Sequence, residues 1–180
     1  MGEIKSTLDI VLEKTKNLKL SSEEKREQKN KEIEGRVKGL LQKYQDGLLS
    51  LEQFNNDYRK LRNNRNLSDD TVVINEIIAR LDLDQNNQTL LGLFKIFGIT
   101  STAIESIFND YKNAYQSAAE IRIEQLKNQF AKNHSISGSA VVPNLMADEQ
   151  WCKDVQAIRV RFEEKLIREK GKLLKDKLEQ

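Results

Sequence analysis

The sequence predicts an all-α protein of six or seven helices, built around a long antiparallel helical hairpin. The chain has 180 residues, is 32% charged with both signs mixed, and contains one proline, a composition typical of long helices. Apolar residues recur three and four positions apart, and no strand-like alternation of useful length occurs. Two stretches of similar length, about 102–133 and 147–178, flank one loop and are expected to pack antiparallel.

An apolar stretch from Leu90 to Phe108 lies at the middle of the chain, and only Lys95 and Glu105 are charged in it. Burial of a large apolar side chain is worth about 1.5–3 kcal/mol, so the flanking helices should fold around this stretch. Gly98 and the polar residues 100–102 divide it into a short helix and the start of a longer one. A membrane-spanning helix needs about 20 mostly apolar residues. We therefore expect no membrane span, and a cytoplasmic protein.

The N-terminal third is expected to hold three helices. Residues 3–19 carry apolar side chains at helical spacing, and Ser21 with Glu24 forms a capping-box pattern that opens a second helix. This second helix has no apolar residue before Ile33, so its first turns should project into solvent. After a turn at Gly47, Ser50 and Gln53 form another capping box, and residues 37–61 are predicted to be a helical hairpin.

The remaining elements follow from caps and loops. An Asn-rich linker at 63–66 precedes a fourth helix capped by residues 68–70, and a polar connection at 82–88 leads into the central apolar stretch. Thr102 and Glu105 are predicted to form the capping box of the long sixth helix, and residues 135–144 are the clearest loop.

A tight turn between the two long helices would fix which of their side chains meet. It would place Phe130 near Trp151 and Leu126 near Val155. The whole chain, 1–180, is expected to form a single helical domain, with possible sub-units at 1–66 and 67–180.

Composition argues against most catalytic and metal sites. Cys152 is the only cysteine and His134 the only histidine, so no disulfide and no Cys/His zinc site can form within one chain. Asp82, Asp84 and Asn86 match the first EF-hand ligand positions, but Leu93 stands where calcium needs a glutamate. No phosphate-binding loop or nucleophile motif occurs. We expect no metal, no cofactor and no enzymatic activity.

The far end of the long hairpin and two named sets of residues are candidate binding surfaces. The first is an apolar interaction surface on the short central helix, formed by Leu90, Leu91, Leu93, Phe94 and Phe97. Whether this helix is covered by its own chain or by a second molecule stays open. The second is a basic cluster with one aromatic ring, a pattern that can contact nucleic acid, formed by Tyr58, Arg59, Lys60, Arg62 and Arg65.

Two short segments resemble known families. The turn Asp46-Gly47 followed by Leu51-Glu52-Gln53-Phe54, within residues 37–61, resembles a short helical hairpin found at the C-termini of many bacterial proteins. That resemblance implies a helix pair used for oligomerisation or docking, and no ligand. Residues 2–9 (Gly-Glu-Ile-Lys-Ser-Thr-Leu-Asp) resemble the start of an uncharacterised family of small helical bacterial proteins, which implies no site and no activity.

The favoured function is a non-enzymatic interaction or scaffold protein that self-associates as a homo-oligomer or docks on a protein partner. Long amphipathic helices and a net charge of only +2 favour it, because a nucleic-acid-binding domain usually carries a larger excess of positive charge. The alternatives are RNA or DNA binding through residues 58–65, and binding of a small apolar ligand between Leu93, Phe94, Phe97 and Phe108.

Overall fold

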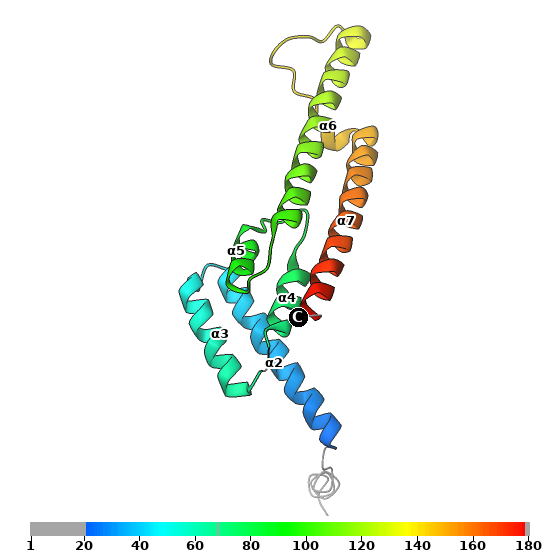
Figure 1. Cartoon of the computed structure of the whole chain (residues 1–180). Coiled ribbons are helices and arrows are strands. Elements are labelled where there is room, and N and C mark those ends of the chain that lie inside the picture. The colour runs from blue at the N-terminus through cyan, green and yellow to red at the C-terminus, as the bar shows by residue number, and fades with distance from the viewer. Residues whose placement is uncertain (1–20, 68, 179–180) are drawn as a thin grey trace, which may run out of the picture. The chain divides into compact units, whose positions relative to one another are not determined.

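The fold is all-α, as the sequence predicts. A computed structural model describes residues 21–67 and 69–178, with side chains through residue 175. These residues form six α-helices and one short 3₁₀ helix, and no strand (Figure 1). The predicted helix over 3–19 and the segment 2–9 lie outside the described residues. The chain divides into two compact units, Met1–Ser68 and Asp69–Gln180, a division two residues from the sub-unit boundary expected at 66.

The first unit contains a helical hairpin of α2 (Ser22–Gln45) and α3 (Leu51–Arg65), which pack against each other. The two capping boxes predicted for this hairpin are confirmed. The backbone N–H of Glu24 donates to Ser21 Oγ at 3.1 Å, and the N–H of Ser21 donates to the Glu24 carboxylate at 2.7 Å. Ser50 and Gln53 repeat this exchange at 3.2 and 2.8 Å. Local sequence alone sets where both helices begin.

A narrow apolar core holds this hairpin together. Phe54 is fully buried, and its ring centroid lies 5.3 Å from that of Tyr44 and 6.3 Å from that of Tyr58. Residues 21–32 are all exposed, as their lack of apolar side chains predicts. The buried apolar side chains on these helices are Ile33, Val37, Leu41, Phe54 and Tyr58.

The second unit contains the remaining elements: α4 (Thr71–Arg80), α5 (Gln88–Ile96), α6 (Thr102–His134), the 3₁₀ helix η1 (Leu145–Ala147) and α7 (Glu149–Leu178). Helix α4 packs against the C-terminal half of α7. There the Lys170 ammonium donates to the carbonyl of Leu81 at 2.6 Å, at the C-terminal end of α4. Burial lowers the pKa of this ammonium. A cation in this position compensates carbonyl groups that the end of a helix leaves without partners.

The predicted start of α6 is correct, but the predicted capping box there is wrong. The N-cap residue is Ser101, and no side chain caps the first backbone N–H groups. Instead the Ser101 hydroxyl donates to the carboxylate of Glu105, one turn along the helix. Thr102 is the first helical residue rather than the cap.

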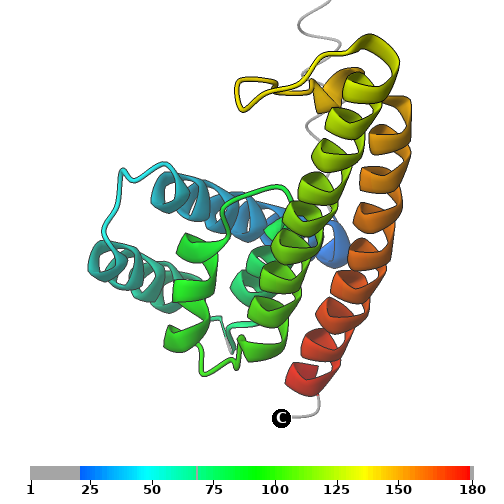
Figure 2. The ribbon, with the colours of Figure 1, turned by 90° about the horizontal axis from the view of Figure 1, so that it is seen from above.

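Helices α6 and α7 form the predicted long antiparallel hairpin, but in a different register (Figure 2). Trp151 packs edge-on against Tyr115, with ring centroids 5.3 Å apart, and Phe162 lies 5.7 Å from Tyr111. The expected pairing of Trp151 with Phe130 is therefore wrong, and the matching expectation for Leu126 and Val155 fails with it.

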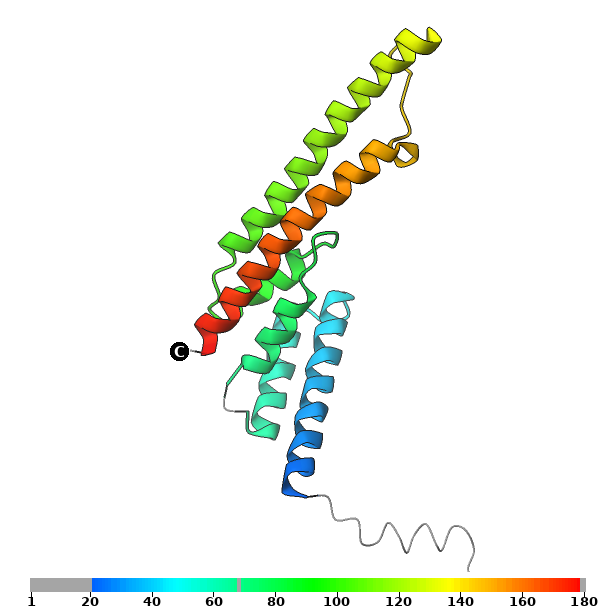
Figure 3. The same cartoon turned by 90° about the vertical axis from the view of Figure 1, so that its right-hand side faces the viewer.

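The physical reason is that residues 135–148 do not make a tight turn. They run back beside the last turns of α6 and through η1 before α7 begins, so α6 extends beyond the start of α7 (Figure 3). From Arg122, which is level with the start of α7, to His134 at the end of α6 is about 18 Å. Leu126 is still buried on this extension, and Pro143 is buried in the returning segment.

Alanine substitutions at two glycines of this unit should change the free energy of unfolding in opposite directions. Gly171 lies inside α7, and a Cβ atom there would meet nothing within 4 Å. Gly171→Ala should raise the free energy of unfolding by about 1 kcal/mol, because glycine is a poor helix former. Gly98 ends α5 with φ +62°, so Gly98→Ala should lower that free energy. Chemical denaturation followed by circular dichroism measures both, and a stabilised Gly98→Ala variant would contradict this interpretation.

Candidate functional site

The apolar surface that the sequence suggested on α5 is mostly core. Leu90, Leu91, Leu93 and Phe94 are all buried, and Phe97 is half-buried. The first four side chains are covered within this chain, so they are corrected from a candidate interaction surface to core residues. Burial of contiguous large apolar side chains is the physical reason, since leaving them in water would cost more than packing them.

The candidate nucleic-acid cluster on α3 is divided by its packing. Tyr58 is buried against Phe54, so its ring is not available to stack on a base. Arg62 donates to the carbonyl of Leu67, and Arg65 forms an ion pair with Glu32. Arg59 and Lys60 are exposed, and Lys60 is paired with Asp57 at 3.2 Å. The structure therefore does not present these five residues as one basic surface.

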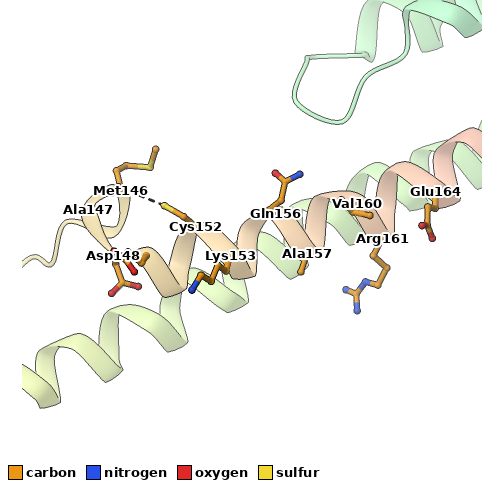
Figure 4. A pocket seen from close by; sticks show the side chains of 11 residues that line it. Met146, Ala147, Asp148, Cys152, Lys153, Gln156, Ala157, Val160, Arg161 and Glu164 are labelled. Carbon is orange, nitrogen blue, oxygen red and sulfur yellow. Dashed lines mark hydrogen bonds between the residues drawn. The ribbon is translucent and has the colours of Figure 1, made fainter.

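A groove of about 1040 Å³ lies along the solvent-facing side of α7, beside η1, and is open to solvent. Figure 4 shows its side chains following one another along the helix from Met146 toward Glu164. Most of its exposed lining surface is apolar, although charged side chains also line it along its length: Asp148, Glu149, Lys153, Arg161 and Glu164. Met146, Lys153, Ala157, Val160 and Glu164 are among the side chains that line it.

Three exposed apolar side chains follow this side of the hairpin. Met146 is 78% exposed, Val160 43% and Ile167 64%. Val160 and Ile167 are seven positions apart, so they share one face of α7. The opposite face of the helix holds the buried Trp151, Phe162 and Leu166. Helix α7 thus has a core-facing apolar stripe and a second, sparser one that faces solvent.

Asp148 fixes the end of the groove where η1 meets α7. Its carboxylate accepts the backbone N–H of Trp151 at 2.7 Å, which is an N-cap interaction. The same carboxylate receives two hydrogen bonds of 2.8 Å from the Arg122 guanidinium on α6. This bidentate pair joins the start of α7 to α6 and sets the hairpin register.

The electrostatics at this anchor agree with its geometry. The hydrogen bond from Arg122, followed by the backbone N–H of Trp151, holds the pKa of the Asp148 carboxyl below its ordinary value. The same hydrogen bond raises the pKa of Arg122. Both side chains are mostly buried, at 15% and 17% exposure. The Arg122–Asp148 pair therefore holds the end of the groove at the start of α7 in place, whereas the end near Glu164 is an ordinary helix surface.

Cys152 lies beside this anchor, at the start of α7. Its side chain is exposed, and its Sγ lies 3.9 Å from the carbonyl oxygen of Met146 (Figure 4). His134, the only histidine, is exposed at the end of α6. Within the part of the chain that the structure describes, no three His, Cys, Asp or Glu side chains cluster as metal ligands would.

A second hollow, of about 690 Å³, lies between the 82–88 connection and α6. Asp84 stands at its wall, where it accepts a hydrogen bond from the Tyr111 hydroxyl at 2.9 Å and pairs with Arg159 at 3.0 Å. Burial, with this hydrogen bond as a smaller cause, raises the pKa of Tyr111 to about 12. Phe108 lines the hollow, but Leu93 and Phe94 are buried in the core. About half of the exposed lining is polar, unlike the apolar ligand cavity that the sequence suggested.

The same connection is ordered by its own side chains. The buried Asn87 accepts the backbone N–H of Asp82 at 3.1 Å and donates to the carbonyls of Asp82 and Gln85. These bonds account for the Asp- and Asn-rich sequence without a bound calcium ion.

Comparison with known proteins gives no match to a family model, to a curated protein or to a solved structure. No helix in the described ranges is long and apolar enough to cross a membrane.

The sequence pointed to the far end of the long hairpin as a candidate surface, but it did not identify the groove along α7. A signal was present, because Val160, Ile167 and Gly171 fall on one face while Trp151, Phe162 and Leu166 fall on the other. That signal is weak, since isolated exposed apolar residues are common on protein surfaces. Only the position of η1 adds Met146 to this face and makes a continuous groove.

Proposed function

We propose that this protein is a non-enzymatic interaction protein that binds another polypeptide along the solvent-facing side of α7. The observation that carries the proposal is the open groove beside η1, with Met146 and Val160 exposed in it. An extended, shallow, mainly apolar face bounded by charged side chains suits a helix or a strand of a partner better than a small molecule, which is usually enclosed.

Energetics support the same proposal. Complete burial of one large apolar side chain is worth about 1.5–3 kcal/mol, and three such side chains lie along this face. An aligned row of exposed apolar side chains on a rigid helix differs from scattered ones, because one partner can cover them all. The nucleic-acid alternative has less support, since the aromatic ring of its cluster is buried.

The test compares the natural chain with a groove variant, Met146→Glu combined with Val160→Glu. Molar mass is measured by light scattering, and co-purifying proteins are identified after affinity capture. We expect the natural chain to form an assembly, with itself or with a defined partner, that the groove variant loses while keeping its helical circular dichroism spectrum. A buried carboxylate in an apolar contact is costly, which is why two substitutions should suffice.

The matched control is Val142→Glu. Val142 is 84% exposed but lies in the returning segment outside the groove, so its substitution should leave assembly unchanged. A natural chain that is monomeric and retains no protein would contradict the proposal. Equal loss of assembly in Val142→Glu and in the groove variant would contradict it as well, because the effect would then not depend on the groove.

A further inference from the structure

The charges along the solvent-facing side of α7 are arranged in a pattern that is complementary to itself. Glu149, Lys153, Glu164 and Arg168 are all exposed there. None of the four takes part in an ion pair or side-chain hydrogen bond within the described part of the chain. Near the start of α7 an acid, Glu149, precedes a base, Lys153. Further along the helix an acid again precedes a base, Glu164 before Arg168.

This order fits an antiparallel copy of the same helix. When a two-fold axis passes between Ile158 and Arg159, residues equally far from it on the two copies face each other. Lys153 then faces Glu164 of the second copy, and Glu149 faces Arg168 of the second copy. The two-fold symmetry repeats each contact, so the interface holds four pairs of opposite charge.

The apolar residues fall into the same arrangement. At the axis, the small Ala157 faces Val160 of the second copy, which lets the two helices approach closely. Met146 lies in η1 beside the first turn of α7, and in this arrangement that turn faces the turn of the second copy that carries the exposed Ile167. The three exposed apolar side chains of this face are therefore covered together.

Gly171 is compatible with this arrangement. It lies inside a long helix, where glycine costs about 1 kcal/mol relative to alanine. Neither backbone strain nor packing within the described chain requires it, because its φ is not positive and a Cβ there would meet nothing within 4 Å. A glycine that the chain itself does not need leaves room at this face for a side chain from outside, although Gly35 and Gly39 inside α2 are equally free of neighbours.

We propose that the protein forms a two-fold homodimer in which the α7 helices pack antiparallel through this face. The inference rests on the proposed function and names its partner as a second copy of this chain. Association of this kind relies on a modest apolar area and on solvent-exposed ion pairs, each worth about 0.2–1 kcal/mol, so the dimer should weaken at high salt.

The experiment is a charge swap on the full chain, read by sedimentation velocity and by light scattering over a concentration series. Lys153→Glu places two acids opposite each other twice in the dimer, and Glu164→Lys does the same with two bases. Each single variant should weaken dimerisation at least about tenfold. An equimolar mixture of the two variants should recover it, since the acid that Lys153→Glu introduces in one chain then faces the base that Glu164→Lys introduces in the other. The double variant should dimerise with itself for the same reason.

Matched controls are Glu124→Lys and Lys132→Glu, which make the same charge changes at exposed positions on α6. They should leave dimerisation unchanged. Cys152 tests whether the two α7 helices run antiparallel, because that arrangement places the two thiols about 20 Å apart along the helices. Mild oxidation should therefore give no disulfide-linked dimer, since such a bond needs Cα atoms within about 7 Å.

The outcomes separate this inference from the proposed function. A dimer that the single variants do not weaken, or that the mixture does not restore, overturns the α7 pairing, and so does rapid formation of a Cys152 disulfide. A monomeric natural chain whose groove still captures a defined partner overturns the dimer but leaves the proposed function standing. A monomer with no groove-dependent partner overturns both.

Discussion

Replacement of Trp151 by alanine is expected to lower the free energy of unfolding of the 69–180 unit by about 3–5 kcal/mol. Trp151 is 2% exposed, and its ring packs edge-on against Tyr115, with centroids 5.3 Å apart. The substitution would leave a cavity at the place where α7 begins, next to the Arg122–Asp148 anchor. Urea denaturation followed by circular dichroism measures the loss, and fluorescence of the natural chain identifies the matching transition, because Trp151 is the only tryptophan.

Trp151→Phe is the matched control for this effect. It retains an aromatic ring against Tyr115 and should cost clearly less than the alanine substitution. An alanine variant whose stability lies within about 0.5 kcal/mol of the natural chain would show that Trp151 does not hold the hairpin register.

Phe54→Ala should have a comparable effect on the other unit, with a loss of about 3–5 kcal/mol. Phe54 is fully buried, and its ring contacts those of Tyr44 and Tyr58. A helical hairpin with so narrow a core has little stability to lose, so the variant should partly unfold over α2 and α3. Hydrogen exchange read by mass spectrometry should show faster exchange across residues 22–65.

Leu51 provides the comparison for Phe54. It lies on the same helix but is 43% exposed, so Leu51→Ala should leave exchange in α2 nearly unchanged. Equal effects of the two substitutions would argue that helix propensity, rather than the aromatic core, holds this hairpin together. Unchanged exchange over α2 and α3 in Phe54→Ala would contradict the predicted role of that core.

The positions of helix starts illustrate which local features can be predicted. Ser21 with Glu24, and Ser50 with Gln53, were sufficient to locate the starts of α2 and α3, because both partners of a capping box lie within four residues. The same pattern at Thr102 and Glu105 placed the N-cap of α6 at Thr102, one residue after the actual N-cap, Ser101. There Glu105 bonds with the Ser101 hydroxyl, which is an equally local alternative that the sequence pattern does not distinguish.

The candidate surfaces show where prediction from periodicity ends. Leu93 and Phe94 on α5, and Tyr58 on α3, have side chains that suit either a binding surface or a core. Periodicity shows that such residues share a face, but it does not show what covers that face. The sequence suggested the far end of the long hairpin but not the groove along α7, since the second, sparser stripe of α7 gains Met146 only from a segment outside the helix.

The sequence by itself determined the helical class, the bounds of the long helices and the position of the main loop, because caps, periodicity and glycine act over a few residues. Only the tertiary structure decided the register of α6 against α7. The contacts of Trp151 with Tyr115 and of Asp148 with Arg122 join residues more than 25 positions apart, and they depend on the path of the segment between them. That register turns the second face of α7 and η1 toward solvent as one groove, and so determines which surface is available for a partner.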